Sequence, residues 1–378
     1  MRILWIPHTG WHIPQRAHLF CRALSERHEV HVTDWVADFS SVKDIFSKRY
    51  LKNYTYRYRR DGNIHVHGIP RVSPALFSKK LRLINQKIFS RYVQQIIDRY
   101  EIDVVVGTFV VPPPQAPTLV LDVFDDNPAY WREFRSNPAM ADEIAEMELA
   151  WATASDRIVV ISSVLQEKLT KQLGKDIQQK IEIIPNGVDL QRFVVADRRR
   201  VRDQLNIGDK KVVGFISGLG EFSGLMRYME SVRHLDRPDV IHLVVGDGAL
   251  LPTARQFVSV HGLTNVRFTG WVKAEEVVDY FAALDVGVIP FDLANFTHSS
   301  FPIKLLEYLA CNIPVVSTPL EEVKRLDLTG VLLAGPDSAS FATGIEQALN
   351  MQTPISQDLT RYDVSYLVGQ YEAILEGR

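Results

Sequence analysis

Short apolar runs alternate along the chain with stretches in which apolar residues recur every three or four positions. Such runs predict buried strands, and the three-to-four spacing predicts amphipathic helices between them. In the first half the predicted strands are Ile3–Ile6, Val30–Val32, Ile102–Val106, Thr118–Val123, Arg157–Ile161 and Ile181–Ile184. In the second half they are Val212–Ile216, Ile241–Val245, Val266–Thr269, Val286–Pro290 and Pro314–Ser317. Because the runs are hydrophobic throughout, they indicate parallel strands covered on both faces.

This alternation predicts an α/β protein built from two successive doubly wound domains. A length of 378 residues and a hydrophobic content of 46 % are enough for two cores. We expect the first domain to be residues 1–190 and the second 191–359, with a helix in 360–378 that packs back on the first. The stretch Pro185–Arg202 joins a Pro-Asn-Gly turn to an arginine-rich segment without apolar periodicity, which predicts a linker.

Charge is unevenly distributed although the net charge is only −2. Residues 1–100 carry 18 Lys and Arg against 7 Asp and Glu, whereas the remainder carries 25 against 38. This asymmetry is typical of a protein with an anionic partner, and equally typical of solvated faces. The basic stretch Lys79–Arg99 has apolar residues at helical spacing, which favours a core helix with a basic outer face over a lipid contact. No nucleic-acid-binding module is recognisable.

Neither a membrane span nor a secretion signal is predicted. The chain has no apolar run of about 18 residues, and its first residues lack the features of a signal peptide. We therefore expect a cytoplasmic protein, with peripheral contact at the inner face of the membrane as an alternative. Cys21 and Cys311 lack the spacing of metal ligands and lie in predicted helices, so we expect core thiols.

The segment Val286–Leu320 combines a strand, a loop, a helix and a second strand, and it contains the most informative site residues. Ser299 and Ser300 are predicted N-cap residues of the helix, and Pro302 suits its first turn. Free backbone N–H groups at Phe301–Leu305 would bind an anion such as a phosphate, and Lys304 would add a positive charge.

Glu307 lies one helical turn beyond the predicted anion site, on the same face as Ile303 and Lys304. Its carboxylate could accept hydrogen bonds from both hydroxyls of a ribose. An equally acceptable interpretation is a solvated i,i+3 ion pair between Lys304 and Glu307.

This segment resembles the donor-binding stretch of glycosyltransferase family 4. The resemblance implies that Glu307 holds the ribose and that the backbone of Pro302, Ile303, Lys304 and Leu305 holds the diphosphate of a nucleotide-sugar. The family's first glutamate, which usually touches the transferred sugar, is replaced here by Ser299.

Other segments match the family in the expected order. Ile183–Phe193 is similar to the interdomain hallmark, with Asn186, Gly187 and Asp189 in place. The resemblance implies that Gly246 in Leu243–Gly248, together with the backbone of Trp271 and Val272, frames the nucleobase. Many relatives carry an arginine and a lysine in the loop that corresponds to Ser217–Gly224, and this loop has neither. Its Gly218 and Gly220 could present backbone N–H groups to a phosphate, or they could simply form a turn.

In the first domain, His8–Arg16 follows the first predicted strand and is similar to the family's first loop. We expect it at the carboxyl end of the sheet, where open α/β sheets bind ligands. His8, Gly10 and His12 are therefore candidates for the acceptor side, and Arg16 for stabilisation of the leaving diphosphate.

Three carboxylates lie at the end of the strand that begins at Thr118. Relatives carry a His or Asp here that contacts the sugar or the acceptor, so Asp125 and then Asp122 are the catalytic candidates, whereas Asp126 suits an N-cap. No Asp-x-Asp is present and the resemblance implies metal-independent transfer, so no metal site and no cofactor are expected. Glu148 and Ser162 fit the family pattern as residues that border the cleft, and Ser162 fits a helix cap equally well.

The resemblance implies a GT-B fold, with two Rossmann-like domains facing a central cleft, and a retaining hexosyltransferase. The donor would be a nucleoside-diphosphate sugar, with UDP preferred for its prevalence in the family, and the acceptor a cell-envelope glycan or a polyprenyl-linked sugar. Two alternatives stay open, a non-catalytic nucleotide-sugar-binding subunit and a sugar-nucleotide epimerase. A nicotinamide oxidoreductase is disfavoured because no Gly-x-Gly-x-x-Gly follows the first strand.

Overall fold

The computed structural model describes residues 1–11, 16–35, 55–72, 79–194, 197–351 and 357–377. The chain divides into two compact units. Unit 1 comprises Met1–Pro185 together with Val364–Arg378, and unit 2 comprises Asn186–Asp363. The predicted boundary after residue 190 lies a few residues beyond this division.

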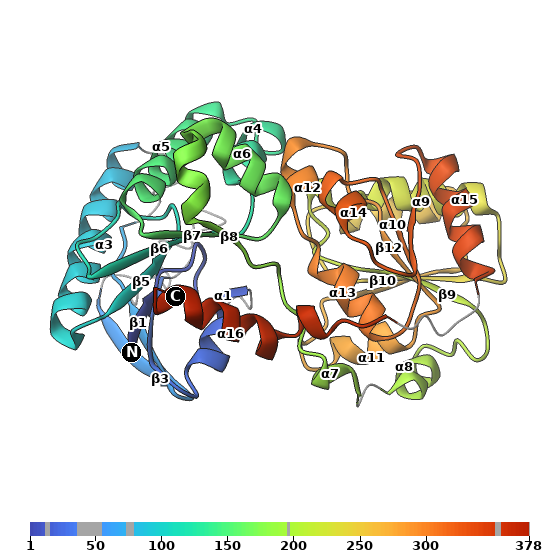
Figure 1. Cartoon of the computed structure of the whole chain (residues 1–378). Coiled ribbons are helices and arrows are strands. Elements are labelled where there is room, and N and C mark those ends of the chain that lie inside the picture. The colour runs from blue at the N-terminus through green and yellow to red at the C-terminus, as the bar shows by residue number, and fades with distance from the viewer. Residues whose placement is uncertain (12–15, 36–54, 73–78, 195–196, 352–356, 378) are drawn as a thin grey trace. The chain divides into compact units, whose positions relative to one another are not determined.

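The described part of unit 1 forms an eight-stranded sheet with the order β3-β4-β2-β1-β5-β6-β7-β8 (Figure 1). Its strands are β1 (Arg2–Trp5), β2 (Glu29–Asp34), β3 (Arg57–Asp61), β4 (Ile64–Gly68), β5 (Val104–Gly107), β6 (Thr118–Val123), β7 (Arg157–Val160) and β8 (Ile181–Ile183). All neighbours are parallel except β3 and β4. The six predicted strands are confirmed, and the β3–β4 hairpin is an addition that the apolar pattern did not predict.

Helices cover both faces of this sheet (Figure 1). They are α1 (Arg16–Leu24), α3 (Lys79–Tyr100), α4 (Asn127–Glu133), α5 (Pro138–Ala154), α6 (Ser163–Leu173) and α16 (Val364–Leu375). The C-terminal helix α16 packs beside α1 in the core of unit 1, as predicted. Tyr371 stacks on Trp5 with 5.3 Å between ring centroids, and Phe20 packs against both rings.

The described part of unit 2 forms a six-stranded parallel sheet with the order β11-β10-β9-β12-β13-β14. Its strands are β9 (Val212–Ile216), β10 (Ile241–Val245), β11 (Val266–Gly270), β12 (Val286–Ile289), β13 (Val315–Ser317) and β14 (Val331–Leu333). Its helices are α7 (Gln191–Val194), α8 (Arg198–Gln204), α9 (Leu225–Leu235), α10 (Leu251–Val260), α11 (Val277–Ala282), α12 (Asn295–Ser299), α13 (Ile303–Ala310), α14 (Glu321–Arg325) and α15 (Ser338–Leu349). The five predicted strands are confirmed, and β14 was not predicted.

The arginine-rich segment that we expected to be a linker instead forms α8 of unit 2. Arg200 pairs with Asp279, and Arg198 pairs with Asp285 at 2.9 Å. Arg202 is buried and donates to the carbonyl oxygen of Ala283 at 2.7 Å. Tertiary ion pairs and hydrogen bonds therefore stabilise a segment that has no apolar stripe.

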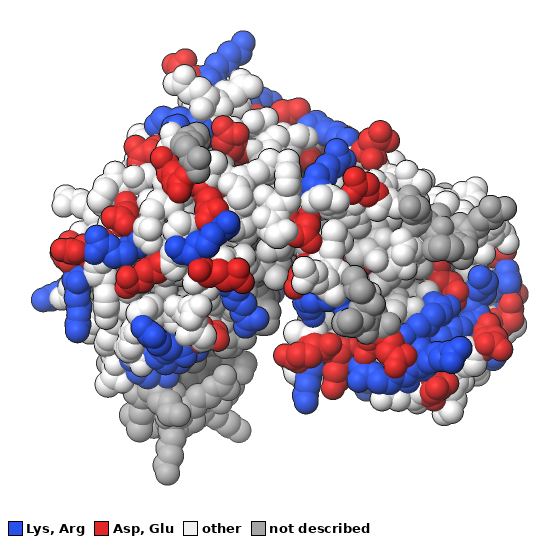
Figure 2. Space-filling model, turned by 60° about the horizontal axis from the view of Figure 1, so that its bottom comes forward, with Lys and Arg blue, Asp and Glu red and all other residues white. Residues whose placement is uncertain are grey.

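Basic and acidic side chains lie interspersed over the face shown in Figure 2. The charge asymmetry of the sequence is therefore not visible there as separate basic and acidic surfaces. Helix α3 buries Phe89, Val93, Ile96 and Ile97, as expected for a core helix, whereas Ile84 is exposed. Among the described residues, no helix is both long enough and apolar enough to cross a bilayer.

Candidate functional site

The order of strands in unit 2 places a topological switch point beside β9. The chain runs from β9 outward to β10 and β11, and then returns to the other side of β9 for β12, β13 and β14. The loops that follow β9 and β12 leave the same edge of the sheet in opposite directions, and such a crevice is the usual ligand site of an open α/β sheet.

Tyr308 of α13 is buried against the open edge of β9. Strand β12 pairs with β9 only as far as Gly287 and Gly214, so the edge of β9 is open beyond that point. The Tyr308 hydroxyl takes the place of the missing strand, because it accepts from the backbone N–H of Ile216 at 3.0 Å and donates to the carbonyl of Gly214 at 3.1 Å. Gly287 makes room for the ring, since a Cβ there would lie 2.4 Å from it. Helix α13 is thereby attached to the switch point.

The start of α13 differs from the prediction. Pro302 is the N-cap, without a side-chain hydrogen bond to the helix. Ser299 is instead the last residue of α12 and Ser300 is its C-cap, and their hydroxyls donate to the carbonyl of Phe296 at 2.9 and 3.0 Å. The N-cap residue of α13 thus supplies no side-chain cap, and the backbone N–H groups of the first turn form a positive helix end.

The interdomain hallmark contributes to the shape of this helix start. Asn186 is buried and its side-chain amide donates to the carbonyl of Phe301 at 2.8 Å. This bond fixes the chain directly before Pro302.

Lys304 and Glu307 pair on α13, with 2.8 Å between Lys304 Nζ and Glu307 Oε2. The Glu307 side chain is only 14 % exposed, so this is a half-buried pair rather than the solvated pair considered from the sequence. The Lys304 ammonium compensates the charge of this carboxylate, and the carboxylate oxygens keep lone pairs that can accept from a ligand hydroxyl.

The loops after β9 and β12 touch each other. Gly224 has φ of +67°, and a Cβ there would lie 1.7 Å from the carbonyl oxygen of Pro290. Arg227, which the sequence analysis missed, donates to Pro290 and Phe291 carbonyls at 2.5 and 3.0 Å and pairs with Asp292 at 2.8 Å. Its bonds position the loop, and only the three-dimensional structure identifies them.

The predicted glycines differ in their surroundings. A Cβ on Gly218 would meet nothing within 4 Å, and one on Gly220 would meet only the Phe222 ring at 3.9 Å. Gly246 has φ of +132°, and a Cβ there would lie 2.0 Å from the Ser217 carbonyl oxygen. Glycine at 246 therefore allows the end of β10 to approach the loop after β9.

Trp271 and Val272 follow directly after β11. The Trp271 side chain is 71 % exposed. Gly246 donates from its backbone to the carbonyl of Gly270 at 3.0 Å, so these predicted base-contacting residues lie at one end of adjacent strands.

In unit 1, Arg16 and Asp122 are buried together. Arg16 Nε lies 3.4 Å from Asp122 Oδ2, and the Tyr371 hydroxyl donates to the same oxygen at 3.2 Å. Arg16 also donates to the Pro185 carbonyl at 2.7 Å. Burial raises the pKa of Asp122, and the Arg16 charge opposes that shift. These contacts give both residues a structural task inside unit 1, and their predicted catalytic roles stay predictions.

The other carboxylates near the end of β6 have separate environments. Asp126 is the N-cap of α4, accepting from the backbone N–H of Ala129 at 3.1 Å, and it pairs with Lys168. Asp125 is half-buried. Glu148 Oε1 is buried without a hydrogen bond among the described residues, and burial raises the pKa of Glu148 to about 8. Ser162 caps α6 by accepting from Leu165 N–H at 3.1 Å, as its plainer interpretation predicted.

His8 lies after β1, at the switch point between β1 and β5 in unit 1. Its ring stacks on Phe124 with 3.7 Å between centroids, and burial lowers the pKa of His8 to about 3. Gly10 is buried in the same loop. His12 lies outside the described residues.

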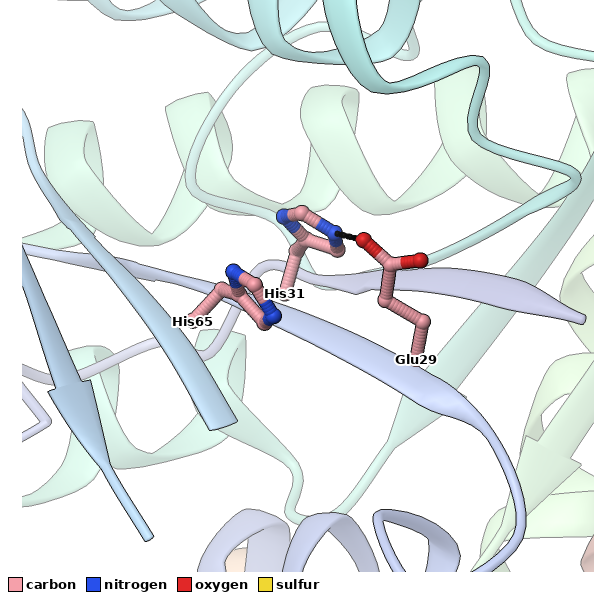
Figure 3. A group of neighbouring side chains, drawn as sticks. All are labelled: Glu29, His31 and His65. Carbon is pink, nitrogen blue, oxygen red and sulfur yellow. Dashed lines mark hydrogen bonds and ion pairs between the residues drawn. The ribbon is translucent and has the colours of Figure 1, made fainter. Parts of the chain in front are cut away.

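A separate group of side chains on β2 and β4 has ligand atoms within 4.8 Å of one another, namely Glu29, His31 and His65. Figure 3 shows Glu29 directed at the His31 ring, with His31 Nε2 3.0 Å from Glu29 Oε1. The His31 and His65 rings are stacked, with planes 21° apart. His31 Nδ1 also lies 2.9 Å from His67 Nε2, and His67 Nδ1 lies 2.7 Å from the Tyr56 hydroxyl, so these side chains form a polar chain.

Comparison with family models gives matches over both units. A model described as Glycosyltransferase Family 4 matches residues 14–192, and one described as Glycosyl transferases group 1 matches residues 210–351.

Curated relatives share moderate identity with this chain. A putative teichuronic acid biosynthesis glycosyltransferase, TuaH, from Bacillus subtilis (strain 168) is 29 % identical over 208 residues, or 54 % of this chain and 51 % of the relative. A D-inositol 3-phosphate glycosyltransferase from Geodermatophilus obscurus is 27 % identical over 246 residues, or 59 % of this chain and 53 % of the relative. The chain thus spans about half the length of these relatives.

Solved structures share the fold over the whole chain. Anabaena Alr3699/HepE, crystallised with UDP and glucose, has a TM-score of 0.72 at 18 % identity, with all of both chains covered. WaaG, described as a glycosyltransferase involved in lipopolysaccharide biosynthesis, has a TM-score of 0.70 at 15 % identity, also with full coverage. These likenesses confirm the predicted GT-B fold.

Proposed function

We propose that this chain, which belongs to glycosyltransferase family 4, the glycosyl transferases of group 1, is a hexosyltransferase that uses a nucleoside-diphosphate sugar. The donor is proposed to be a UDP-sugar and the acceptor a cell-envelope glycan or a polyprenyl-linked sugar. UDP and glucose in the HepE crystal and the role named for TuaH support these choices.

One observation carries the proposal for the donor. The Glu307 carboxylate, half-buried and paired with Lys304 at 2.8 Å, lies one turn inside the start of α13. A ribose hydroxyl would donate to this carboxylate, and the diphosphate would accept from the first-turn N–H groups beside Lys304. Attachment of α13 to β9 through Tyr308 would hold both groups at the switch point.

In the proposed reaction, the oxygen of the acceptor hydroxyl bonds to the anomeric carbon, and its proton passes to an oxygen of the departing diphosphate. The bond between the anomeric carbon and the diphosphate breaks, and its electron pair leaves with UDP. The negative charge that develops on the diphosphate would be stabilised by the start of α13 and by Lys304. We propose that transfer retains the anomeric configuration and needs no metal. Asp125 is the acidic side chain that we propose for contact with the reacting sugars, because relatives carry a His or Asp at this place in the resemblance.

Thermal unfolding in the presence of UDP, GDP, ADP and TDP tests the donor. We expect UDP to raise the melting temperature, since a ligand at 100 times its Kd stabilises by about 2.7 kcal/mol. Glu307→Ala should abolish this shift, whereas Lys324→Ala, which removes an exposed i,i+3 partner on α14, is the matched control and should retain it. Retention of the full shift in Glu307→Ala would contradict the ribose assignment, and no shift with any nucleotide would contradict the donor site.

Activity measurements separate the proposal from its alternatives. Transfer from UDP-sugars to cell-envelope acceptors is expected, and it should persist after treatment with EDTA. Loss of activity with EDTA, restored by a divalent cation, would overturn the proposal that transfer needs no metal. Nucleotide binding without transfer would favour the non-catalytic subunit, and isomerised donor without an acceptor would identify an epimerase.

A further inference from the structure

Strands β2 and β4 of unit 1 carry apolar residues on one face and histidines on the other. Their apolar residues belong to the hydrophobic core of unit 1, namely Val30, Val32, Ile64 and Val66. Successive side chains of a strand point to opposite faces, so the residues that alternate with these share the second face, namely Glu29, His31, His65 and His67. The two strands are parallel neighbours with His31 opposite His65. The fold therefore brings three imidazoles and one carboxylate together.

This polar cluster lies in the amino-terminal halves of its strands. Glu29 is the first residue of β2, and His65 is the second residue of β4. Open α/β sheets bind their ligands at the other edge, beyond the carboxyl ends of the strands. The His31 side chain is fully buried, whereas the Glu29 side chain is 44 % exposed, so solvent reaches the cluster from the Glu29 side. The cluster is thus accessible and separate from the candidate sugar sites.

Glu29, His31 and His65 have the composition and the spacing of metal ligands (Figure 3). Their ligand atoms lie within 4.8 Å of one another, and His31 Nε2 lies 3.0 Å from Glu29 Oε1. Ligands at about 2.1 Å from a tetrahedral zinc ion are about 3.4 Å apart. A shift of about 1.5 Å or less by Glu29 and His65, which both reach solvent, would close the group around one ion. Two imidazoles and one carboxylate are a set that zinc binds in proteins.

The neighbours of His31 allow its ring to bind a cation through Nε2. Without an ion, the Tyr56 hydroxyl can donate to His67, and His67 Nε2 can donate to His31 Nδ1. His31 Nε2 then donates to Glu29. With an ion on His31 Nε2, each of the first two bonds reverses, and His67 donates to the Tyr56 oxygen. Every group of the chain keeps a partner in both states, and the bond from His31 Nδ1 to His67 would orient the ligand ring.

His65 can present its Nε2 to the same ion. Its Nδ1 lies 2.7 Å from the Tyr58 hydroxyl, which can accept from an Nδ1–H group. Nε2 then keeps its lone pair, and Arg60 Nη2 faces it at 3.4 Å. The Arg60 side chain is exposed, so a cation can displace it into the solvent.

Arginine side chains around the cluster set the charge that a cation must overcome. Arg60 comes from β3, and the positive charge of Arg99 acts on His67 from α3. Arg2 on β1 is paired with Glu101 at 2.6 Å, which compensates its charge. Arg60 is therefore the direct competitor of a cation for His65.

We propose that Glu29, His31 and His65 bind a divalent transition-metal cation, with zinc as the expected ion. Three protein ligands leave one tetrahedral position for water. The ion would join β2 to the β3–β4 hairpin at the edge of the sheet, so its role is structural and the proposed sugar transfer still needs no metal. The inference goes beyond the proposed function and does not depend on it.

Zinc binding can be measured on the full chain. The protein is freed of metal by dialysis against EDTA and then buffer, and it is titrated with zinc chloride in a calorimeter at about pH 7.5, where imidazoles are largely neutral. We expect one zinc ion per chain with a Kd in the micromolar range. Zinc at about 100 times its Kd should raise the melting temperature by about 5–10 °C. Magnesium, which prefers oxygen ligands, should give neither effect.

Variants locate the ion. Glu29→Gln should weaken zinc binding at least about 10-fold, because a charged ligand is lost, whereas Glu26→Gln, another exposed carboxylate of unit 1, should leave it unchanged. His65→Gln should weaken binding to a similar degree, with the exposed His234→Gln as its control. Arg60→Gln should tighten binding by about 3- to 10-fold, since it removes the opposing charge.

Two outcomes would overturn the proposal. One is absence of zinc binding up to about 1 mM. The other is unchanged affinity in both Glu29→Gln and His65→Gln, which would place the ion elsewhere. Stabilisation by UDP is measured separately on the same samples, so failure of the donor site leaves the zinc site standing, and the reverse also holds.

Discussion

Replacing Tyr308 with phenylalanine removes the hydroxyl that bonds the open edge of β9 and keeps the ring that fills the space beside Gly287. The hydroxyl bridges Ile216 N–H and the Gly214 carbonyl where β12 has diverged from β9. Burial raises the pKa of Tyr308, so the hydroxyl is protonated and donates at any physiological pH.

The magnitude follows from the groups left behind. Tyr308 is fully buried, so water cannot replace its oxygen, and an unsatisfied buried donor costs about 1–3 kcal/mol. For a unit of this size that loss lowers the melting temperature by about 2–4 °C per kcal/mol. Because the same hydroxyl attaches α13 to β9, we also expect the Kd for UDP to rise by about 3- to 10-fold, or roughly 0.7–1.4 kcal/mol.

Urea unfolding and calorimetric titration with UDP measure the two effects separately. The matched control is Tyr366→Phe, whose exposed side chain should contribute within about 0.5 kcal/mol. Unchanged stability in Tyr308→Phe would refute the bridging role of the hydroxyl. A loss of stability with unchanged UDP affinity would refute the link between this bridge and the start of α13.

Two further substitutions test the loops of unit 2 and the acidic residues of unit 1. Gly224→Ala should lower the free energy of unfolding in urea by about 2–4 kcal/mol, because the added Cβ would meet the Pro290 carbonyl and the residue has a positive φ. Gly218→Ala is the control and should change this free energy little. Equal losses of stability in the two variants would contradict the close approach at Gly224. The raised pKa of Glu148 keeps the folded state protonated up to about pH 8, whereas the unfolded state ionises near pH 4.5, so this group costs stability as pH rises between these values. In Glu148→Gln, stability should fall less steeply between pH 5 and pH 7.5 than in the parent protein, by up to about 1.4 kcal/mol per pH unit. If variant and parent differ in their free energy of unfolding by the same amount at both pH values, the raised pKa of Glu148 is contradicted.

Most of the strands that the sequence predicted are continuous apolar runs buried on both faces, such as β5, β9 and β10, whereas β8 and β11 are partly exposed. The β3–β4 hairpin was missed because β3 reads Arg-Tyr-Arg-Arg-Asp and lies largely exposed at an edge, where no burial imposes a pattern. Helix α8 was missed for a different reason, since its stability comes from ion pairs with Asp279 and Asp285, about 80 residues away in sequence.

Those parts of the candidate site that depend on residues close together in the sequence could be predicted. Pro302, Lys304 and Glu307 follow from helix geometry and the resemblance, and the structure places them at the start of α13. The Tyr308 bridge could not be predicted, because it depends on where β12 leaves β9. Likewise, Arg16 and Asp122 read as independent site residues until the fold brings them together across 106 positions.

Helix α16 has a consequence for the order in which the chain folds during synthesis. The Tyr371 ring completes the unit 1 core against Trp5 and Phe20, yet it is made only after the whole of unit 2. Unit 2 is one continuous segment and can fold as it leaves the ribosome, whereas unit 1 must wait with an open apolar face until its last helix is released. Contacts between residues far apart in sequence form slowly, and α16 must reach the rest of unit 1 across the whole of unit 2. We therefore expect unit 1 to be the part that most needs protection by chaperones during translation.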